Sequence, residues 1–280
     1  MFTTIDIFGV ELPYYGIMTG LGILACFLLL KFTAKQRKNI EPIEYVCIGL
    51  SGGVCAFIMA HLVYGVAQFD KLCYIITHPD RLFESVNMFL IYIFDVFGGM
   101  VFYGGLIGAC LGGFIYMKRA RLDVKEYADT IAPCIPLFHA FGRIGCFLAG
   151  CCYGMESKVG FTYHYSMVES ANGVCRFPIQ LVESAENFIL CAILVIILYK
   201  CKNIKHGILI WIYGLTYPVI RFINEFFRGD VDERGYFGVL STSQWISIII
   251  FVLSLIMIVI NIRNNNKKEN QNVLQEEAII

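Results

Sequence analysis

Long apolar runs separated by short polar connections dominate this chain. Most of the runs reach the ~20 apolar residues that an α-helix needs to cross a bilayer. The pattern predicts an all-α polytopic membrane protein with about seven transmembrane helices rather than a soluble domain. We expect the spans near residues 14–32, 44–67, 88–117, 129–150, 180–200, 206–225 and 239–262.

Lysine and arginine gather in alternate connections, after the first, third, fifth and seventh runs. They are Lys31, Lys35, Arg37, Lys38, Lys118, Arg119, Arg121, Lys125, Lys200, Lys202, Lys205, Arg263, Lys267 and Lys268. The positive-inside rule puts these connections in the cytoplasm, which predicts an N-terminus outside and a C-terminus inside. Residues 1–262 would then form a single integral membrane domain, and the Asn-, Lys- and Glu-rich residues 263–280 a disordered cytoplasmic tail.

Composition agrees with a membrane setting. Hydrophobic residues make up 58% of the 280 residues and charged residues 16%, against roughly a quarter charged in soluble domains. The formal net charge is zero, so nothing favours a nucleic-acid partner. The first charged residue is Asp6 and no basic segment precedes the first run, so we do not expect a cleavable signal peptide.

Residues 142–154 form the segment that packing alone explains least well. They read Gly-Arg-Ile-Gly-Cys-Phe-Leu-Ala-Gly-Cys-Cys-Tyr-Gly and close the fourth run. Arg143 therefore lies at or near the end of a bilayer-embedded helix, where a cation requires a partner or an anionic ligand. The glycines allow the backbone to come close to a neighbour or the helix to break.

A second charged group ends the sixth run. On a helix, Arg221, Glu225 and Arg228 fall at positions i, i+4 and i+7 and share one face. One interpretation is a self-neutralising ladder that holds helices together. The other is an anion site in which Glu225 orients one guanidinium and leaves the other for a phosphate, which arginine recognises well.

Two further segments carry polar or glycine-rich patterns. Residues 98–108 hold paired glycines around an aromatic, which predicts either a break entering the third span or small-residue helix packing. Arg176, Gln180 and Glu183 open the fifth span, where Pro178 suits a helix start.

Together with Tyr14-Tyr15-Gly16 and residues 241–247, these segments resemble the prolipoprotein diacylglyceryl transferase family. The resemblance implies transfer of the diacylglyceryl group of phosphatidylglycerol to the lipobox cysteine of a prolipoprotein, with glycerol 1-phosphate as the second product. It also implies a multi-pass protein of the bacterial cytoplasmic (inner) membrane with its site on the outer face. The expected partners are phosphatidylglycerol, the prolipoprotein signal peptide and the lipid bilayer, and no cofactor or metal is expected.

The resemblance carries Arg143, Gly154, Arg221, Glu225 and Tyr15 over as site residues, because these positions match the family pattern. With the candidates chosen from the residues themselves, the catalytic candidates are Arg143, Arg221, Glu225, Tyr103 and His139, and the substrate-binding candidates are Tyr15, Gly104, Gly154, Arg176, Gln180, Glu183, Arg228, Cys146 and Cys151. The chain departs from the family pattern where Cys146 replaces Asn, Cys151 an acidic residue, Tyr103 a His, His61 an Arg and Phe177 a His. Two residues are candidates for the missing base. Tyr103 stands where the family commonly has His, and His139 lies one helical turn before Arg143.

The role of the cysteines is open, and with it the choice between the family reaction and its alternatives. Of twelve, Cys73, Cys146, Cys151, Cys152 and Cys175 are expected near the outer face. They could be inert packing residues, a disulfide, for instance to Cys175, or a reactive thiol; their spacing is not that of a standard zinc site. A divergent paralogue acting on another acceptor and a non-enzymatic anionic-lipid-binding membrane protein are the alternatives to the family reaction.

Overall fold

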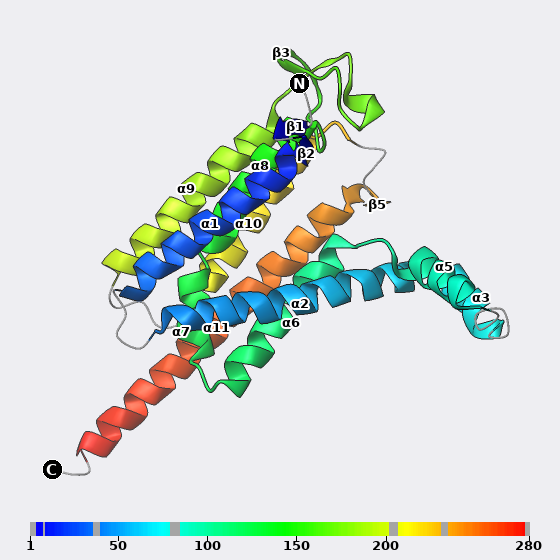
Figure 1. Ribbon diagram of the computed structural model, residues 1–280. Coiled ribbons are helices and arrows are strands. Elements are labelled where there is room, and N and C mark those ends of the chain that lie inside the picture. The colour runs from blue at the N-terminus through cyan, green and yellow to red at the C-terminus, as the bar shows by residue number, and fades with distance from the viewer. Residues whose placement is uncertain are drawn as a thin grey trace. The chain divides into compact units, whose positions relative to one another are not determined.

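The computed structural model describes residues 4–7, 9–35, 40–78, 85–201, 207–230 and 235–277. The chain divides into two compact units (Figure 1). The larger unit comprises Met1–Gln36 and Lys125–Ile280, and the smaller unit comprises Arg37–Val124. Most described residues are helical, which agrees with an all-α membrane protein.

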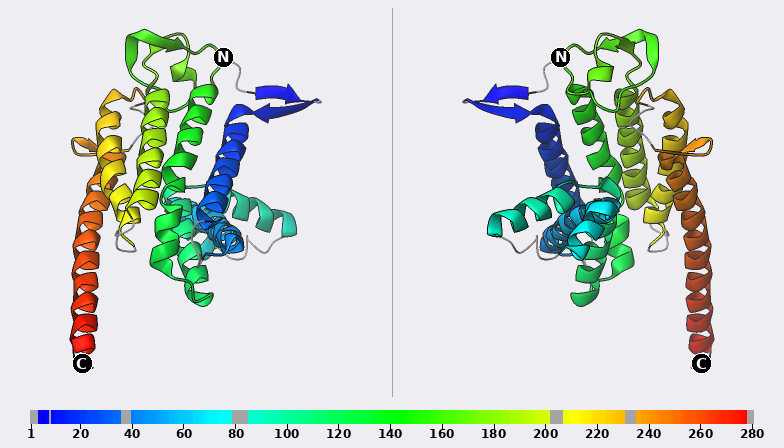
Figure 2. Two further views of the ribbon diagram at one scale, coloured as in Figure 1. Left: turned by 90° about the vertical axis from the view of Figure 1, so that its left-hand side faces the viewer. Right: turned by 90° about the vertical axis from the view of Figure 1, so that its right-hand side faces the viewer.

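A row of helices builds the larger unit. Its helices are α1 (Tyr14–Lys35), α7 (Val124–Ile131), α8 (Cys134–Ala149), α9 (Ile179–Lys200), α10 (Leu209–Asn224) and α11 (Thr242–Glu277). Helix α1 packs on α8, α8 on α9, α9 on α10 and α10 on α11, and Figures 1 and 2 show these helices side by side. A buried apolar cluster of Ala132, Leu190, Leu194 and Leu209 joins α9 and α10.

Local sequence signals explain where these helices begin and end. Gly150 follows α8 in the left-handed conformation, with φ of 75°, and its N–H bonds back to the Cys146 carbonyl. Ser241 and Gln244 form a capping box before α11, because each side chain accepts a hydrogen bond from the other's backbone N–H at 3.2 and 3.0 Å. Pro178 stands directly before α9.

Short strands and turns connect the helices of the larger unit. They are β1 (Thr4–Ile7), β2 (Val10–Pro13), β3 (Glu156–Thr162), η1 (Glu169–Ala171), β4 (Cys175–Arg176), η2 (Glu225–Phe227), β5 (Tyr236–Phe237) and β6 (Leu240–Ser241). The described strands form three sheets of two antiparallel strands each. A single β-bridge joins Gly154 to Arg228 and so links the segment after α8 to the segment after α10.

Glycine packing organises the smaller unit, which contains α2 (Pro42–Ala67), α3 (Phe69–Thr77), α5 (Val86–Phe97) and α6 (Phe102–Arg119). Helices α2 and α6 pack together extensively. A Cβ added at Gly104, Gly108 or Gly112 would overlap a backbone carbonyl of α2. Helix α6 therefore approaches α2 more closely than any larger residue would allow.

Each predicted span lies on one or two observed helices, and the run at 129–150 covers the end of α7 and all of α8. The apolar run at 88–117 is split between α5 and α6, so the predicted break at the paired glycines is confirmed. Within the described residues, five segments are long and apolar enough to cross a membrane: Tyr14–Ala34, Pro42–Ala67, Val124–Ala149, Ile179–Lys200 and Thr242–Asn264. Many of their large side chains are exposed, as lipid-facing positions require; Leu28 is 55% exposed and Ile189 is 61% exposed. Seven spans and the orientation of the termini stay predictions.

The expected domain organisation stays a prediction: a single membrane domain over residues 1–262 and a disordered tail over residues 263–280. The described residues of this range fall into the two compact units, and helix α11 is described as far as Glu277.

Candidate functional site

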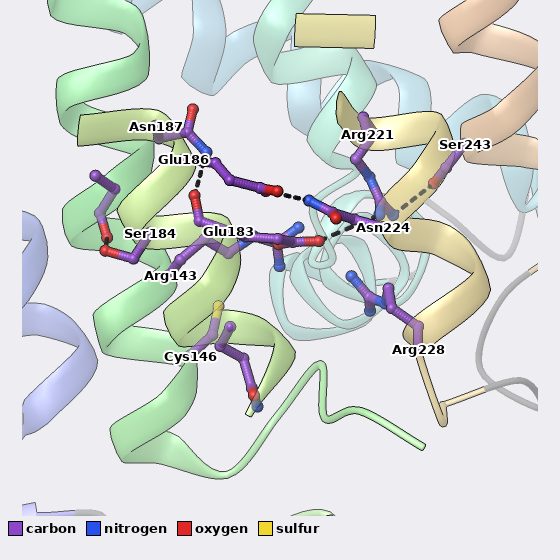
Figure 3. Close-up of polar contacts among 12 residues, drawn as sticks. Arg143, Cys146, Glu183, Ser184, Glu186, Asn187, Arg221, Asn224, Arg228 and Ser243 are labelled. Carbon is purple, nitrogen blue, oxygen red and sulfur yellow. Dashed lines mark hydrogen bonds and ion pairs between the residues drawn. The ribbon is translucent and has the colours of Figure 1, made fainter. Parts of the chain in front are cut away.

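A buried ion-pair network joins three helices of the larger unit. Glu183 on α9 pairs through one carboxylate oxygen with Nε of Arg143 on α8. Its other oxygen lies 3.4 Å from Nη1 of Arg221 on α10. The three side chains are between 5 and 12% exposed. Glu183 therefore bridges the two arginines that the sequence analysis selected (Figure 3).

Arg221 has further partners on either side. Its Nη2 lies 2.5 Å from the Glu225 carboxylate one turn later and donates to Ser243 Oγ at 3.1 Å. The predicted pairing of Arg221 with Glu225 is therefore confirmed. Because Arg221 bonds to residues of α9, η2 and α11, its guanidinium is held in one orientation.

Arg228 does not continue this helical face. Helix α10 ends at Asn224, and Arg228 has extended backbone angles after the 3₁₀ turn η2. The expectation that Arg228 shares a face with Arg221 and Glu225 is therefore wrong, because the helix ends before the i+7 position. Its side chain pairs instead with Asp230, with Nε 2.9 Å from Oδ1. Burial lowers the pKa of Arg228, but the hydrogen bond and charge of Asp230 outweigh burial and raise it.

The three guanidiniums lie around one buried region. Figure 3 shows Arg143 and Arg221 meeting at Glu183, with Arg228 pointing toward the same space. Glu183 acts electrostatically on Arg228 as well as on Arg143. Among the residues that the structure describes, Nε of Arg143 is buried and has no hydrogen-bond partner, although it pairs with Glu183 by charge. The Arg143 guanidinium therefore keeps unused N–H donors that an anion could accept.

Several polar residues around the network were not selected from the sequence. Asn187 is 2% exposed and donates to the Glu183 carbonyl at 2.7 Å. Asn224 Nδ2 lies 2.5 Å from Glu186 Oε2, and Asp230 holds Arg228. A signal existed for Asn187 and Glu186, because both lie within about a helical turn of Glu183 in an otherwise apolar span.

Three cysteines lie beside Arg143. The Sγ atoms of Cys146, Cys151 and Cys152 are all within 4.8 Å of one another. Hydrogen bonds with Cys146 and Cys151, followed by the charges of Arg228 and Arg143, lower the pKa of Cys152. All twelve cysteines are free thiols in the structure, so it contains no disulfide to Cys175.

The remaining polar candidates of the larger unit have structural partners. Arg176 donates to the Ser170 carbonyl at 2.6 Å and stacks over the Tyr153 ring at 4.1 Å, so it anchors the loop between α8 and α9. Gln180 donates to the Cys151 carbonyl at 2.9 Å. Within the part of the chain that the structure describes, neither side chain is hydrogen-bonded to Arg143, Arg221 or Arg228, and their binding of substrate stays a prediction.

Close backbone contacts position two other candidates. Gly154 forms the bridge to Arg228, and an added Cβ would overlap the Phe177 carbonyl oxygen. Tyr15 on α1 packs against Gly145 of α8 and lies within electrostatic range of the three cysteines and Arg143. Both residues therefore border the arginine and cysteine groups.

The two base candidates lie in different units. His139 on α8 packs against the Tyr217 ring, with centroids 5.1 Å apart. Tyr103 and Gly104 belong to α6 of the smaller unit, where Gly104 packs against α2. The glycine-rich segment therefore fits both interpretations: the helix breaks at Gly98 and Gly99, and Gly104 and Gly108 pack closely on α2.

The comparisons with known proteins all point to the same family. A model of the prolipoprotein diacylglyceryl transferase family matches residues 3–260. A phosphatidylglycerol–prolipoprotein diacylglyceryl transferase of Clostridium tetani is 33% identical over 254 residues, which cover 89% of this chain and 93% of the relative. A relative from Clostridium perfringens, named phosphatidylglycerol–prolipoprotein diacylglyceryl transferase 2, is 34% identical over 95% of this chain and 97% of the relative. The corresponding transferase of Helicobacter pylori (strain G27) is 30% identical over 94% of this chain and 93% of its own length. This chain therefore belongs to the prolipoprotein diacylglyceryl transferase family.

Proposed function

We propose that this protein transfers the diacylglyceryl group of phosphatidylglycerol to the lipobox cysteine thiol of prolipoproteins. In this reaction the thiol sulfur attacks the glycerol carbon bonded to the phosphate oxygen. A C–S bond forms, the C–O bond breaks, glycerol 1-phosphate leaves, and the thiol proton passes to a base. The named activity of the relatives from two clostridial species supports the proposal.

One structural observation carries this proposal: Arg143, Arg221 and Arg228 surround one buried region at the carboxylate of Glu183. Negative charge grows on the phosphate as the C–O bond breaks, and fixed guanidiniums stabilise such charge strongly. Arg143 offers its unused N–H donors to the phosphate. Glu183 and Glu225 orient the guanidiniums and balance their charge while the site is empty.

Further assignments complete the proposed site. Tyr15 and Gly154 border the bound headgroup, since they lie beside the arginine and cysteine groups. We assign the role of the base that accepts the thiol proton to His139, because it lies one helical turn from Arg143 on α8. Tyr103, the other candidate, belongs to α6 of the smaller unit. Arg176 and Gln180 are assigned to holding the fold around the lipid and the signal peptide, and Gly104 to the close packing of α6 on α2 within the smaller unit.

The proposed topology places this site at the outer face of the bacterial cytoplasmic membrane. Seven spans, with the N-terminus outside, put the ends of α8 and α10 and the loop between α8 and α9 on that side. A reporter fused after residue 262 should then be active only in its cytoplasmic form. Activity of a periplasmic reporter at that position would contradict the proposed topology.

The decisive test is transfer of labelled diacylglycerol from phosphatidylglycerol to a lipobox peptide. Arg143→Lys removes the planar, multidentate donor geometry, which costs about 1.5–3 kcal/mol per charged hydrogen bond. We expect the rate to fall roughly ten- to a hundred-fold. Arg263→Lys, on the exposed side of α11, should keep the wild-type rate. No label transfer by folded wild-type protein would refute the proposed function.

A second function is favoured by the thiols beside Arg143. Because Cys146 and Cys151 replace an amide and an acidic residue of the family pattern, a paralogue with another acceptor would depend on them. Reverting Cys146 to Asn and Cys151 to Glu distinguishes the two. We expect transfer to the lipobox peptide to be kept or raised; a lipid-dependent activity that the reversion abolishes would favour the paralogue.

A further inference from the structure

The thiols of Cys146, Cys151 and Cys152 lie close together beside Arg143, although only the first of them belongs to helix α8. Cys146 is on the last turn of α8, whereas Cys151 and Cys152 follow the helix. The left-handed Gly150 reverses the chain, and the Cys151 N–H bonds back to the Cys146 carbonyl at 3.1 Å. Cys152 is itself left-handed, with φ of 55°, an uncommon conformation outside glycine. The turn thus holds all three sulfurs within 4.8 Å of one another.

This arrangement has the chemistry of a soft-metal site. Thiolate sulfurs select Cu(I), Zn(II) and iron–sulfur clusters over harder ions. Sulfurs that share a tetrahedral zinc lie ~3.8 Å apart, as follows from a metal–sulfur bond of ~2.3 Å. The observed separations therefore need to shorten by only about 1 Å or less, which side-chain rotation can supply.

The number of ligands distinguishes between the soft metals. The group contains three cysteines and no fourth His, Cys, Asp or Glu donor within the part of the chain that the structure describes. A structural zinc site uses four such ligands. We propose that Cys146, Cys151 and Cys152 form a three-coordinate site for a soft monovalent d¹⁰ metal ion, with Cu(I) preferred to Zn(II).

The surroundings suit a metal complex with net negative charge. Three thiolates around Cu(I) carry a charge of −2, and the guanidiniums of Arg228 and Arg143 both act on Cys152. Cys146 is 9% exposed and Cys151 and Cys152 are half-buried, so an ion can enter from one side and lose its water. Binding of the metal releases the thiol protons. The spacing of the three cysteines in the sequence indicated no metal site, because the sequence spacing does not show that the chain reverses at Gly150.

A binding titration tests the site without any assay of transfer. The full-length protein in detergent, reduced beforehand, is titrated with Cu(I) held by a chromophoric chelator. We expect one equivalent to leave the chelator and the copper X-ray absorption spectrum to report sulfur ligands only. Each single variant Cys146→Ser, Cys151→Ser or Cys152→Ser should weaken binding at least ten-fold. Cys175→Ser is the matched control and should bind like the wild type, because Cys175 lies outside the group.

Three results would overturn the proposal. One is wild-type protein that takes no more Cu(I) than the triple serine variant. Another is tighter binding of Zn(II) than of Cu(I) by the three thiols. The third is a copper spectrum of the wild type that contains nitrogen or oxygen ligands in place of sulfur, a measurement that does not depend on whether any variant folds.

Discussion

In helix α6, Gly104, Gly108 and Gly112 lie one turn apart and all face α2, whereas Gly145, Gly150 and Gly154 each meet a different neighbour. Gly145 contacts Tyr15, Gly150 reverses the chain, and Gly154 lies against Phe177 and Arg228. The regular spacing builds one helix–helix contact, as small-residue motifs in membranes do. The irregular spacing brings four chain segments together around charged side chains and thiols. Glycine content alone therefore does not separate a packing motif from a site; the regularity of the spacing does.

Glu183 is the charged residue on which the ion-pair network of the larger unit depends. Glu183→Gln leaves Arg143 and Arg221 buried without their shared carboxylate, and removing one partner of a buried ion pair costs about 3–5 kcal/mol. We expect the free energy of unfolding in detergent to fall by that amount, measured by denaturation followed by circular dichroism. The control is Glu156→Gln, whose side chain is exposed in β3 and should have little effect. Equal losses from both variants would show that the network does not stabilise the larger unit.

Gly154→Ala tests whether the close backbone contacts serve the site. The added Cβ overlaps the Phe177 carbonyl oxygen, so the bridge to Arg228 must open and the guanidinium must move. We expect a loss of stability of about 1–3 kcal/mol and a fall in transfer rate on the order of ten- to a hundred-fold. Gly20→Ala on α1 is the control, since an added Cβ there meets nothing within 4 Å. Unchanged transfer in the Gly154 variant would separate this bridge from catalysis.

Much of the fold followed from the apolar pattern because burial in lipid leaves the chain few alternatives to helix. The helices near the predicted spans and the break at Gly98 and Gly99 were predictable for that reason. The pairing of Arg221 with Glu225 was also predictable, since it is a local i, i+4 contact within one helix. Such contacts depend only on helical geometry.

The contacts that the sequence did not predict depend on turns or on other helices. Arg228 does not lie on the helical face of Arg221, because α10 ends at Asn224, and its partner is Asp230. The thiol group depends on the reversal at Gly150. The bridge from Arg143 to Arg221 through Glu183 joins three helices, so no spacing within one helix could reveal it.

Gly108→Ala tests the close packing of α6 on α2. The added Cβ overlaps the Cys55 carbonyl oxygen, so α2 and α6 must separate, and we expect a loss of about 1–3 kcal/mol in stability. Transfer per folded molecule should stay at the wild-type rate. Gly53→Ala on α2 is the matched control, because its Cβ meets nothing within 4 Å and alanine favours helix by up to about 1 kcal/mol. Lower transfer at full stability in the Gly108 variant would give α6 a direct part in the reaction.

Gly142 should show the smallest effect, because it belongs to neither class of glycine. It lies within α8 directly before Arg143, and a Cβ added there meets nothing within 4 Å. Gly142→Ala should therefore stabilise the protein by up to about 1 kcal/mol through helix propensity alone. Transfer should stay within about two-fold of the wild type, since no atom near Arg143 has to move. If stability rises as expected but transfer falls further, the open space beside Gly142 is occupied by substrate during the reaction. That result would move Gly142 into the site and would show that an unfilled position beside a buried arginine marks a ligand as clearly as a close contact does.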